Sequence, residues 1–407
     1  MSAAPDILSP EYDANPYPFY EVLRNEHPVM WHEGTQAYVI SRYEDVAGAF
    51  RNPQISSRNY EWQTEPVHGR TILQMEGKEH SSYRGIVNPI FRGSYLEQSI
   101  VPAITKAARQ QIGEFLADGE VDLCKRFSTY YPIGVIVQLL DLPMEDVPQF
   151  YEWYTMIMDF VSNITGDEEK NRRGMAARVE MGEYLMPKIS ERRADPGDDL
   201  LTAMVTKEFD GVQMSDDDIR GFCSLLLTAG GETTEKAITL TMRNLLDNPE
   251  QMAEVRADRQ LIGSAFAETL RFTGPVQMIM RHTDEPVEFS GGKVEAGYTL
   301  ELLLGAANRD PEAFDEPDRF NIHRTDMEFD KAFTAAADHT AFALGRHFCV
   351  GSMLARAELT VAMDALLDAM DDIAYADGYE QVETGVYTRG LTSLPLTFTP
   401  NPDFVAG

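Results

Sequence analysis

Residues 342–351, Phe-Ala-Leu-Gly-Arg-His-Phe-Cys-Val-Gly, constrain the structure of this chain more than any other segment. They contain Cys349, one of only three cysteines, and apolar residues recur at helical spacing directly after it. A cysteine at the start of a helix faces unpaired backbone N–H groups and the positive end of the helix dipole, which favour the thiolate. Gly345 and Gly351 let the backbone turn tightly and approach a flat molecule without a Cβ clash. The segment therefore predicts a thiolate in a tight loop before a helix.

Cys349 allows two interpretations when it is taken alone. One thiolate lacks the partner ligands of a structural zinc site, but a single protein sulfur can hold a haem iron as its axial ligand. In that case His347 would reach a haem propionate. The alternative is a buried, unreactive cysteine in a glycine-containing loop, since cysteines outside disulfides are commonly buried.

The composition is ordinary for a globular protein, with 43% hydrophobic and 25% charged residues. No linker-like tract, repeat or low-complexity segment divides the sequence, so we expect a single domain over residues 1–407. No run of roughly 18 or more apolar residues occurs. Residues 1–30 are polar and contain proline, which argues against a membrane anchor or a secretory signal. Three widely spaced cysteines suit the reducing cytoplasm.

The formal net charge of −31 makes nonspecific nucleic-acid binding unfavourable. Asp and Glu are abundant, and lysine is scarce beside arginine. A salt-rich environment and a solubilising surface both account for this balance. We therefore expect no nucleic-acid partner.

The local patterns predict many helices and a smaller amount of strand. Residues 37–40 predict a strand and residues 43–52 a helix, which favours an α+β fold over a pure bundle. Residues 56–75 show no periodicity and predict a long loop, either functional or mobile at the surface. The aromatic and methionine residues of 150–161 form core or lie in a lid over a pocket. Residues 382–398 predict a closing hairpin.

His80 and Arg84 are four residues apart, so on a helix they share one face. Together they can bind one anionic group. Such a pair alone is more often a solvated helix face.

Residues 215–248 predict one long helix. Ser215 and Asp218 form a capping-box-like start, and Asn248 precedes a proline that ends the pattern. Gly230 and Gly231 lie in the middle, where each costs about 1 kcal/mol relative to alanine. Close approach of a cofactor, or a local opening of the helical hydrogen bonds, would explain them. The alternative is two helices broken at this point.

Glu268 and Arg271 can pair at i,i+3 on a further helix, which alone is a very weak signal. The string Phe-x-x-Gly-x-His-x-Cys-x-Gly, in contrast, closely resembles the cysteine-ligand loop of the cytochrome P450 family, the haem-thiolate monooxygenases. Ala343 departs from it, since many members have glycine there. The other elements occur in the family's order, and the chain resembles a soluble bacterial cytochrome P450.

This resemblance implies a mostly α fold with minor β, the triangular cytochrome P450 architecture, in one domain. It implies haem b (iron protoporphyrin IX) as cofactor. The implied reaction is the insertion of one oxygen atom from O₂ into a C–H bond of a small-to-medium apolar organic substrate. Because no flavin or nicotinamide domain is fused to the chain, electrons are expected from a separate ferredoxin and its reductase.

The resemblance also assigns roles to single residues. Cys349 is the expected iron ligand, Glu232 the acid and Thr233 the alcohol that route protons to the reacting oxygen. Glu268 and Arg271 join Arg319 to pin the loops beneath the haem, and Arg356 faces the redox partner. Arg346, which also flanks Cys349, is the second candidate for a basic docking patch. The remaining residues expected to contact the haem are His80, Arg84, Gly230, Arg281, Phe342, His347 and Gly351.

Two rival functions share parts of this pattern. A peroxide-driven haem-thiolate enzyme would keep the cysteine loop but needs no acid–alcohol pair. A non-enzymatic haem-binding sensor would also tolerate the loss of that pair. Glu232 and Thr233 therefore favour the monooxygenase over both.

Overall fold

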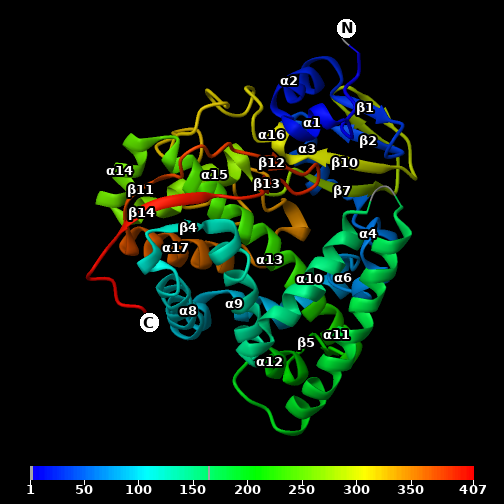
Figure 1. Ribbon diagram of the computed structural model, residues 1–407. Helices are drawn as coiled ribbons and strands as arrows, with labels where there is room; N and C mark the ends of the chain where they lie inside the picture. Colours follow the sequence, from blue (N-terminus) through cyan, green and yellow to red (C-terminus); the bar gives the residue numbers. More distant parts are fainter. Residues whose placement is uncertain (1–2, 164–165) are drawn as a thin grey trace. The chain divides into compact units, whose positions relative to one another are not determined.

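The computed structural model describes residues 3–163 and 166–407 (Figure 1). The chain forms two compact units that interleave along the sequence. Unit 1 comprises the chain up to Ser56, Thr105–Ser128 and Thr233–Gly407, and unit 2 comprises Ser57–Ile104 and Thr129–Glu232. The expectation of a single domain over residues 1–407 stays a prediction.

A five-stranded sheet in unit 1 combines N-terminal strands with two strands from residues 278–303, in the order β1-β2-β10-β7-β3. Strand β2 pairs parallel with β10, and the other neighbours pair antiparallel. The strand expected over residues 37–40 is confirmed as β2. Apolar side chains of β10 and of the helices around the sheet form two buried clusters. The strands are β1 (Val29–His32), β2 (Ala37–Ile40), β3 (Ile55–Ser56), β7 (Met278–Thr283) and β10 (Thr299–Leu303).

Helices and small sheets make up the rest of unit 1. The predicted hairpin over residues 382–398 is only partly correct, because β12 pairs with β13 whereas β14 joins β11 and β4. The helices are α1 (Pro10–Ala14), α2 (Tyr17–Glu26), α3 (Tyr43–Arg51), α14 (Pro249–Ala257), α15 (Ile262–Thr273), α16 (Leu304–Ala307) and α17 (Ser352–Ala369). The strands are β4 (Glu120–Asp122), β8 (Val287–Phe289), β9 (Gly292–Val294), β11 (Met370–Tyr375), β12 (Glu383–Thr384), β13 (Gly390–Leu391) and β14 (Pro395–Pro400). Helix α8 (Val101–Gly113) crosses from unit 2 into unit 1.

Unit 2 is almost entirely helical. Its aromatic stripe on α10 packs against α11, where Trp153 Nε1 donates a hydrogen bond to Glu180 at 3.0 Å and Phe150 contacts the ring of Tyr184. Phe150 and Trp153 are therefore core. Met156, Met158 and Phe160 are only partly buried, so the lid interpretation of the stripe stays a prediction. The elements are α4 (Tyr60–Gln63), α5 (Glu65–His68), α6 (Gly77–Val87), α7 (Gly93–Tyr95), α9 (Tyr131–Leu139), α10 (Val147–Val161), α11 (Glu168–Ala194), α12 (Leu200–Thr206), β5 (Glu208–Phe209) and β6 (Val212–Gln213).

Residues 56–75 differ from the expected long loop. They contain the short helices α4 and α5, and many of their side chains are buried, including Tyr60, His68 and Met75. A mobile surface loop is therefore the wrong interpretation of this segment. Sequence periodicity missed the two helices because each has only four residues.

Helix α13 (Asp216–Leu246) continues from unit 2 into unit 1. Its predicted capping box is confirmed: Ser215 N donates to Asp218 Oδ2 at 2.9 Å, and Asp218 N donates to Ser215 Oγ at 3.2 Å. Among the described residues, no helix combines the length and the apolar character that a membrane span requires.

Candidate active site

The backbone of the cysteine loop closes on itself before α17. The Cys349 N–H donates to the Phe342 carbonyl at 3.0 Å, and the Phe348 N–H donates to the Gly345 carbonyl at 3.2 Å. A 3₁₀ turn, Gly345–His347, lies between these bonds. Cys349 is thereby held three residues before the first residue of α17, Ser352. The loop before a helix that the sequence predicts is confirmed.

Two residues of the loop have left-handed backbone conformations. Gly345 has φ +70°, and a Cβ atom on it would lie 2.4 Å from the Phe50 carbonyl oxygen, so only glycine fits. Ala343 has φ +55° and is 4% exposed. A left-handed conformation costs a residue with a Cβ atom roughly 1–2 kcal/mol. Alanine in place of the family's usual glycine therefore adds backbone strain within the loop itself.

The three cysteines have different environments. Burial raises the pKa of Cys124 and of Cys223 to about 12, so both remain thiols at neutral pH. Cys349 is only partly buried. A Cβ atom placed on Gly351 would lie 3.9 Å from the Cys349 Sγ. Apart from the two chain neighbours of Gly351, no other described atom would lie within 4 Å of it. Glycine thus keeps the space beside the sulfur open.

The donor set fits a haem better than a metal ion held by protein ligands alone. Among residues 3–163 and 166–407, no group of three or more His, Cys, Asp or Glu side chains could hold a metal ion. Cys349 offers a single sulfur beside the open position at Gly351. A porphyrin would supply the other iron ligands that such a site lacks, and the Cys349 thiolate would hold the iron.

Arg281 and the cysteine loop contact the same residue of α3. The guanidinium of Arg281 lies 5.1 Å from the centre of the Phe50 ring, and the Phe50 carbonyl faces Gly345. Arg281 is 5% exposed on β7. The structure therefore brings a buried positive charge and the loop together within unit 1. His347 is partly buried in the loop, and the ring of Phe342 packs edge-on against Phe348.

His80 and Arg84 lie on α6 in unit 2, four residues apart on one face as expected. His80 is 5% exposed and Arg84 is partly buried. An imidazole and a guanidinium on one helix face suit an anionic group such as a carboxylate. Their contact with a haem propionate stays a prediction.

Helix α13 is unbroken at its two glycines. The expected local opening of the helical hydrogen bonds and the alternative of two separate helices are therefore both wrong. The α-helix is continuous from Asp216 to Leu246. A Cβ atom on Gly230 would lie 3.0 Å from Ile136, and one on Gly231 would lie 3.3 Å from Tyr154. Both glycines therefore allow close packing against α9 and α10 within unit 2. This packing explains the lost helix propensity, and the haem contact expected of Gly230 stays a prediction.

The acid–alcohol pair follows directly on α13, where Glu232 and Thr233 are both partly buried. The next residue, Thr234, is 4% exposed. It hydrogen-bonds the carboxyl group of Glu358 on α17, and burial raises the pKa of Glu358 to about 8. Sequence reasoning missed Glu358. A carboxyl group four residues after buried Leu354 on the apolar face of its helix was the available signal.

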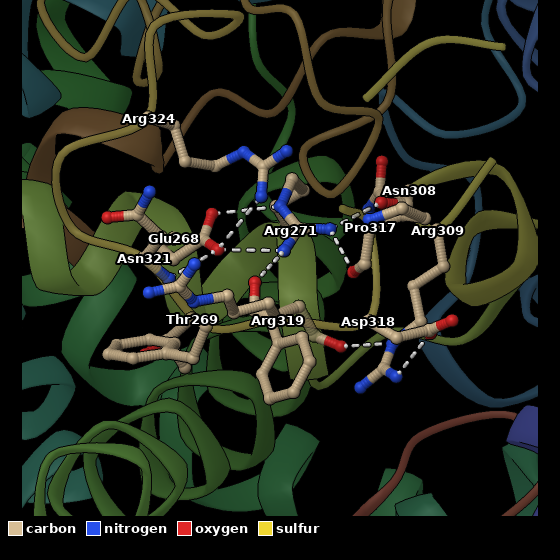
Figure 2. Close-up of polar contacts among 12 residues, drawn as sticks. Glu268, Thr269, Arg271, Asn308, Arg309, Pro317, Asp318, Arg319, Asn321 and Arg324 are labelled. Atoms are coloured by element: carbon tan, nitrogen blue, oxygen red, sulfur yellow. Dashed lines mark hydrogen bonds and ion pairs between the residues drawn. The ribbon is translucent and has the colours of Figure 1, made fainter. Parts of the chain in front are cut away.

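The predicted pair of Glu268 and Arg271 forms the centre of a buried ionic network (Figure 2). Arg271 donates to both carboxylate oxygens of Glu268, at 2.7 and 2.8 Å, and both side chains are fully buried. Arg271 also donates to the backbone carbonyls of Asn308 and Pro317, at 3.0 and 2.8 Å. The arginine therefore ties a long connecting segment to α15.

The third arginine of this network is not the one that the sequence indicated. Arg319 contributes only its backbone carbonyl, which accepts from Arg271 at 3.1 Å, while its guanidinium pairs with Glu316 at the surface. Arg324 takes the expected place: its Nη1 lies 3.6 Å from Glu268 Oε1, and its side chain is 3% exposed. Only four residues of irregular chain lie between the two arginines, so local spacing did not distinguish them.

The comparisons with known proteins agree with this arrangement. The family model for cytochrome P450 matches residues 136–371. Pulcherriminic acid synthase of Bacillus subtilis (strain 168) is 38% identical over 96% of this chain and 97% of its own length. Cytochrome P450 monooxygenase PikC of Streptomyces venezuelae is 32% identical, over 96% of this chain and 92% of its own. The crystal structure of CalO2 superposes with a TM-score of 0.88 at 27% identity, covering both chains completely.

These matches span almost the whole chain and extend from sequence to fold. They confirm the expected fold class, mostly α with minor β, and they identify haem b as the cofactor that the chain binds. Relatives of this kind are oxidoreductases that act as monooxygenases. The chain belongs to the cytochrome P450 family.

Proposed function

We propose that this enzyme inserts one oxygen atom from O₂ into a C–H bond of a small-to-medium apolar organic molecule. Electrons come from a separate ferredoxin and its reductase, and the reaction takes place in the cytoplasm. The observation that carries the proposal is the partly buried Cys349, presented by a closed loop with open space at Gly351. The reaction class follows from the membership of the chain in the cytochrome P450 family.

Each side chain has a distinct part in this proposal. The haem, when bound, binds and activates O₂. Cys349 holds the iron and donates electron density, while His80, Arg84, Arg281 and His347 hold the propionates. Glu232 is partly exposed, so it can exchange protons with water and pass them to the adjacent Thr233 hydroxyl, which delivers them to the reacting oxygen. Phe342, Gly230 and Gly351 border the haem.

Replacing Thr233 with alanine separates this proton route from the fold. Haem content and substrate affinity should stay close to those of the wild type, while electrons drain into hydrogen peroxide. Loss of a positioned proton-transfer group slows the step that it serves by roughly 10²- to 10⁴-fold. Product formed per NAD(P)H consumed is the measurement, and Thr233→Ser, which keeps the hydroxyl, is the matched control. If Thr233→Ala formed as much product per NAD(P)H consumed as the wild type, Thr233 would have no part in proton delivery.

The same measurement distinguishes the two rival functions. A peroxide-driven enzyme would form product with added peroxide but none with NAD(P)H and the electron-transfer proteins, and it would be insensitive to the change at Thr233. A haem-binding sensor would form no product under either condition. The presence of the Glu232–Thr233 pair, with both side chains partly buried on α13, supports the oxygen-activating reaction over both rivals.

The name of the relative with 38% identity suggests one product to test. We propose pulcherriminic acid, which that relative synthesises according to its name, as the first product to test. The assay is mass spectrometry of extracts from cells that express this chain or its Cys349→Ser variant. Pulcherriminic acid in the first extract alone supports the candidate, and its absence from both removes it.

Arg356 tests the proposed redox partner. Its guanidinium is partly buried and lies 5.2 Å from the centre of the Phe333 ring, whereas Arg346 is exposed and donates to the Ile55 carbonyl at 2.8 Å. A net charge of −31 repels an acidic ferredoxin overall, so docking needs local positive charge. Arg356→Glu should therefore slow electron transfer from the ferredoxin, most strongly at low salt, and affect turnover with added peroxide much less.

Arg356→Lys is the control for the contact with Phe333, because it keeps the charge but loses the planar guanidinium. It should transfer electrons nearly as fast as the wild type. Equal losses with ferredoxin and with peroxide, in either variant, would mean that Arg356 supports the protein interior, and the docking role would be wrong.

A further inference from the structure

The proposed reaction does not use Glu301, a buried carboxyl group on β10 in unit 1. Its side chain is 1% exposed. Leu303 lies two residues further along the strand and therefore points to the same face of the sheet. Leu303 belongs to the apolar cluster that also contains Ile7 and Tyr12. The carboxyl group therefore lies on the face of the sheet that the N-terminal end of the chain covers.

A series of hydrogen bonds connects Glu301 to the protein surface. Glu301 Oε2 lies 3.0 Å from Thr35 Oγ1, which in turn lies 3.0 Å from His32 Nδ1. His32 Nε2 lies 3.0 Å from Asp6 Oδ1, and the side chain of Asp6 is 65% exposed. The backbone N–H of Thr35 donates to His32 Nδ1 at 3.2 Å. Nδ1 is therefore an acceptor, and the proton of the neutral ring lies on Nε2, which donates to Asp6.

Residues 3–9, which we call the N-terminal strap, carry the surface end of this series of bonds. Ile7 is fully buried, and a Cβ atom on Gly34 would lie 3.1 Å from Leu8 Cδ1. The strap is therefore packed on the turn between β1 and β2. Helix α1, which follows the strap, is held separately, because Arg389 donates to the carbonyl of its last residue at 2.9 Å. The strap can thus lift from the sheet while α1 stays in place.

The surroundings of Glu301 favour its protonated form. The residues opposite it on β2 and β7 are Val39 and Met280. Burial raises the pKa of Glu301 to about 7, and the hydrogen bond from Thr35 offsets only part of this effect. The other titratable or charged groups around it, from the turn, the strap, α1, α2 and the residue before β13, are His32, Asp6, Tyr12, Tyr20 and Arg389. Both tyrosines stay neutral because burial raises their pKa. Among the described residues, no cationic group forms an ion pair with Glu301.

We propose that Glu301 and the N-terminal strap form a pH-sensitive latch, which is closed while Glu301 is protonated and loosened when Glu301 is ionised. A protonated carboxyl group donates to Thr35 Oγ1, so the Thr35 hydroxyl donates in turn to His32 Nδ1. A carboxylate only accepts, so the hydroxyl turns toward Glu301 and His32 loses this donor. The buried carboxylate is also stabilised when water reaches it, which requires the strap to lift. This latch does not depend on the proposed reaction.

The pH dependence of the latch has a defined sign. Above pH 4.5, the ordinary pKa of a glutamate, Glu301 is ionised in the open state, whereas in the closed state it keeps its proton up to about pH 7. The closed state therefore has its full stability below about pH 4.5 and loses it as the pH rises to about 7. The opening constant levels off above this window. Hydrogen bonds from the Leu8 backbone and from His32 lower the pKa of Asp6, so the contribution of Asp6 is lost only at lower pH.

Glu301→Gln tests the latch, because its amide has the shape of the protonated acid but does not titrate. Hydrogen exchange of the haem-loaded protein, followed by mass spectrometry from pH 5 to pH 8, reports opening through two amides of the strap. These are the N–H groups of Leu8 and Ser9, which donate to Asp6 at 2.9 and 3.1 Å. Comparing both proteins at the same pH cancels the intrinsic pH dependence of exchange. The ratio of the wild-type rate to the variant rate should rise roughly 50- to 100-fold over this range, mostly below pH 7.

His32→Gln is the control for the imidazole, because its amide still donates to Asp6 but does not titrate. The rise with pH should remain in this variant, since the buried carboxylate is unchanged. A rise that persists in Glu301→Gln, or that disappears in His32→Gln, would assign the effect to His32 and overturn the role of Glu301. Strap amides that exchange without protection in the wild type at pH 5 would overturn the latch as well.

Thermal unfolding of each variant at pH 5 and pH 8 shows whether the fold is intact. Glu301→Met places an uncharged side chain of similar length on β10, and it provides the same comparison if glutamine prevents folding. Its exchange rates, relative to those of the wild type, should show the same rise with pH. An unchanged ratio in a folded Glu301→Met protein would contradict the latch.

Discussion

Replacing Cys349 with serine or histidine should abolish the red-shifted absorption band of the reduced carbon monoxide complex and eliminate oxygen insertion. The expectation rests on electron donation by a thiolate, which neither a hydroxyl nor an imidazole reproduces. The closed loop, with its Phe342–Cys349 hydrogen bond of 3.0 Å, should still form, because that bond uses backbone atoms only. Difference spectroscopy and product analysis of the purified variants check both parts.

Cys223 provides the matched control. Its thiol is fully buried, and its raised pKa of about 12 keeps it protonated. Cys223→Ala should therefore keep the red-shifted band, with at most a small loss of stability from the missing sulfur. A band that survived in Cys349→Ser would contradict the assignment of the iron ligand and, with it, the proposed function.

The second large effect concerns the buried network around Glu268. Glu268→Ala should lower the free energy of unfolding by roughly 3–5 kcal/mol, because it leaves the fully buried charge of Arg271 without its carboxylate, whereas Arg324 keeps its ion pair with Asp326 at 2.7 Å. Arg271 contacts both oxygens of that carboxylate and two backbone carbonyls of the segment 308–317. Removing the carboxylate should therefore loosen this segment as well. Denaturant unfolding measures the loss, and proteolysis within 308–317 reports the local effect.

Arg319→Ala is the control that separates the two arginines. Its guanidinium is 67% exposed and pairs with Glu316, which is 72% exposed. Surface pairs of this kind contribute roughly 0–1 kcal/mol, so the substitution should be close to neutral. Arg271→Lys should be costly despite its retained charge, because an ammonium group cannot reproduce the forked contact with a carboxylate. A neutral Arg271→Lys, or a costly Arg319→Ala, would contradict the network in Figure 2.

The sequence-based predictions that were confirmed concern interactions between residues close together in the chain. The capping box of Ser215 and Asp218, the strand over residues 37–40 and the loop at Cys349 were all predictable, because each depends on residues close together in the chain. Local spacing also identified Glu268 and Arg271 as a pair. The resemblance to a family then supplied the fold class that no single segment could determine.

Tertiary packing decided the rest. The glycine pair at 230–231 has its steric reason in Ile136 and Tyr154, which are about 75–100 residues away in sequence, so spacing along the helix could not reveal it. Arg324 replaces Arg319 because the chain between them turns inward, and an arginine is paired in the interior only where its backbone brings it there. The burial of Glu358 and His68 likewise depends on the helices packed against them. The sequence alone determined the local structures and the identity of the sulfur, and three-dimensional packing determined which polar groups lost water and became available for chemistry.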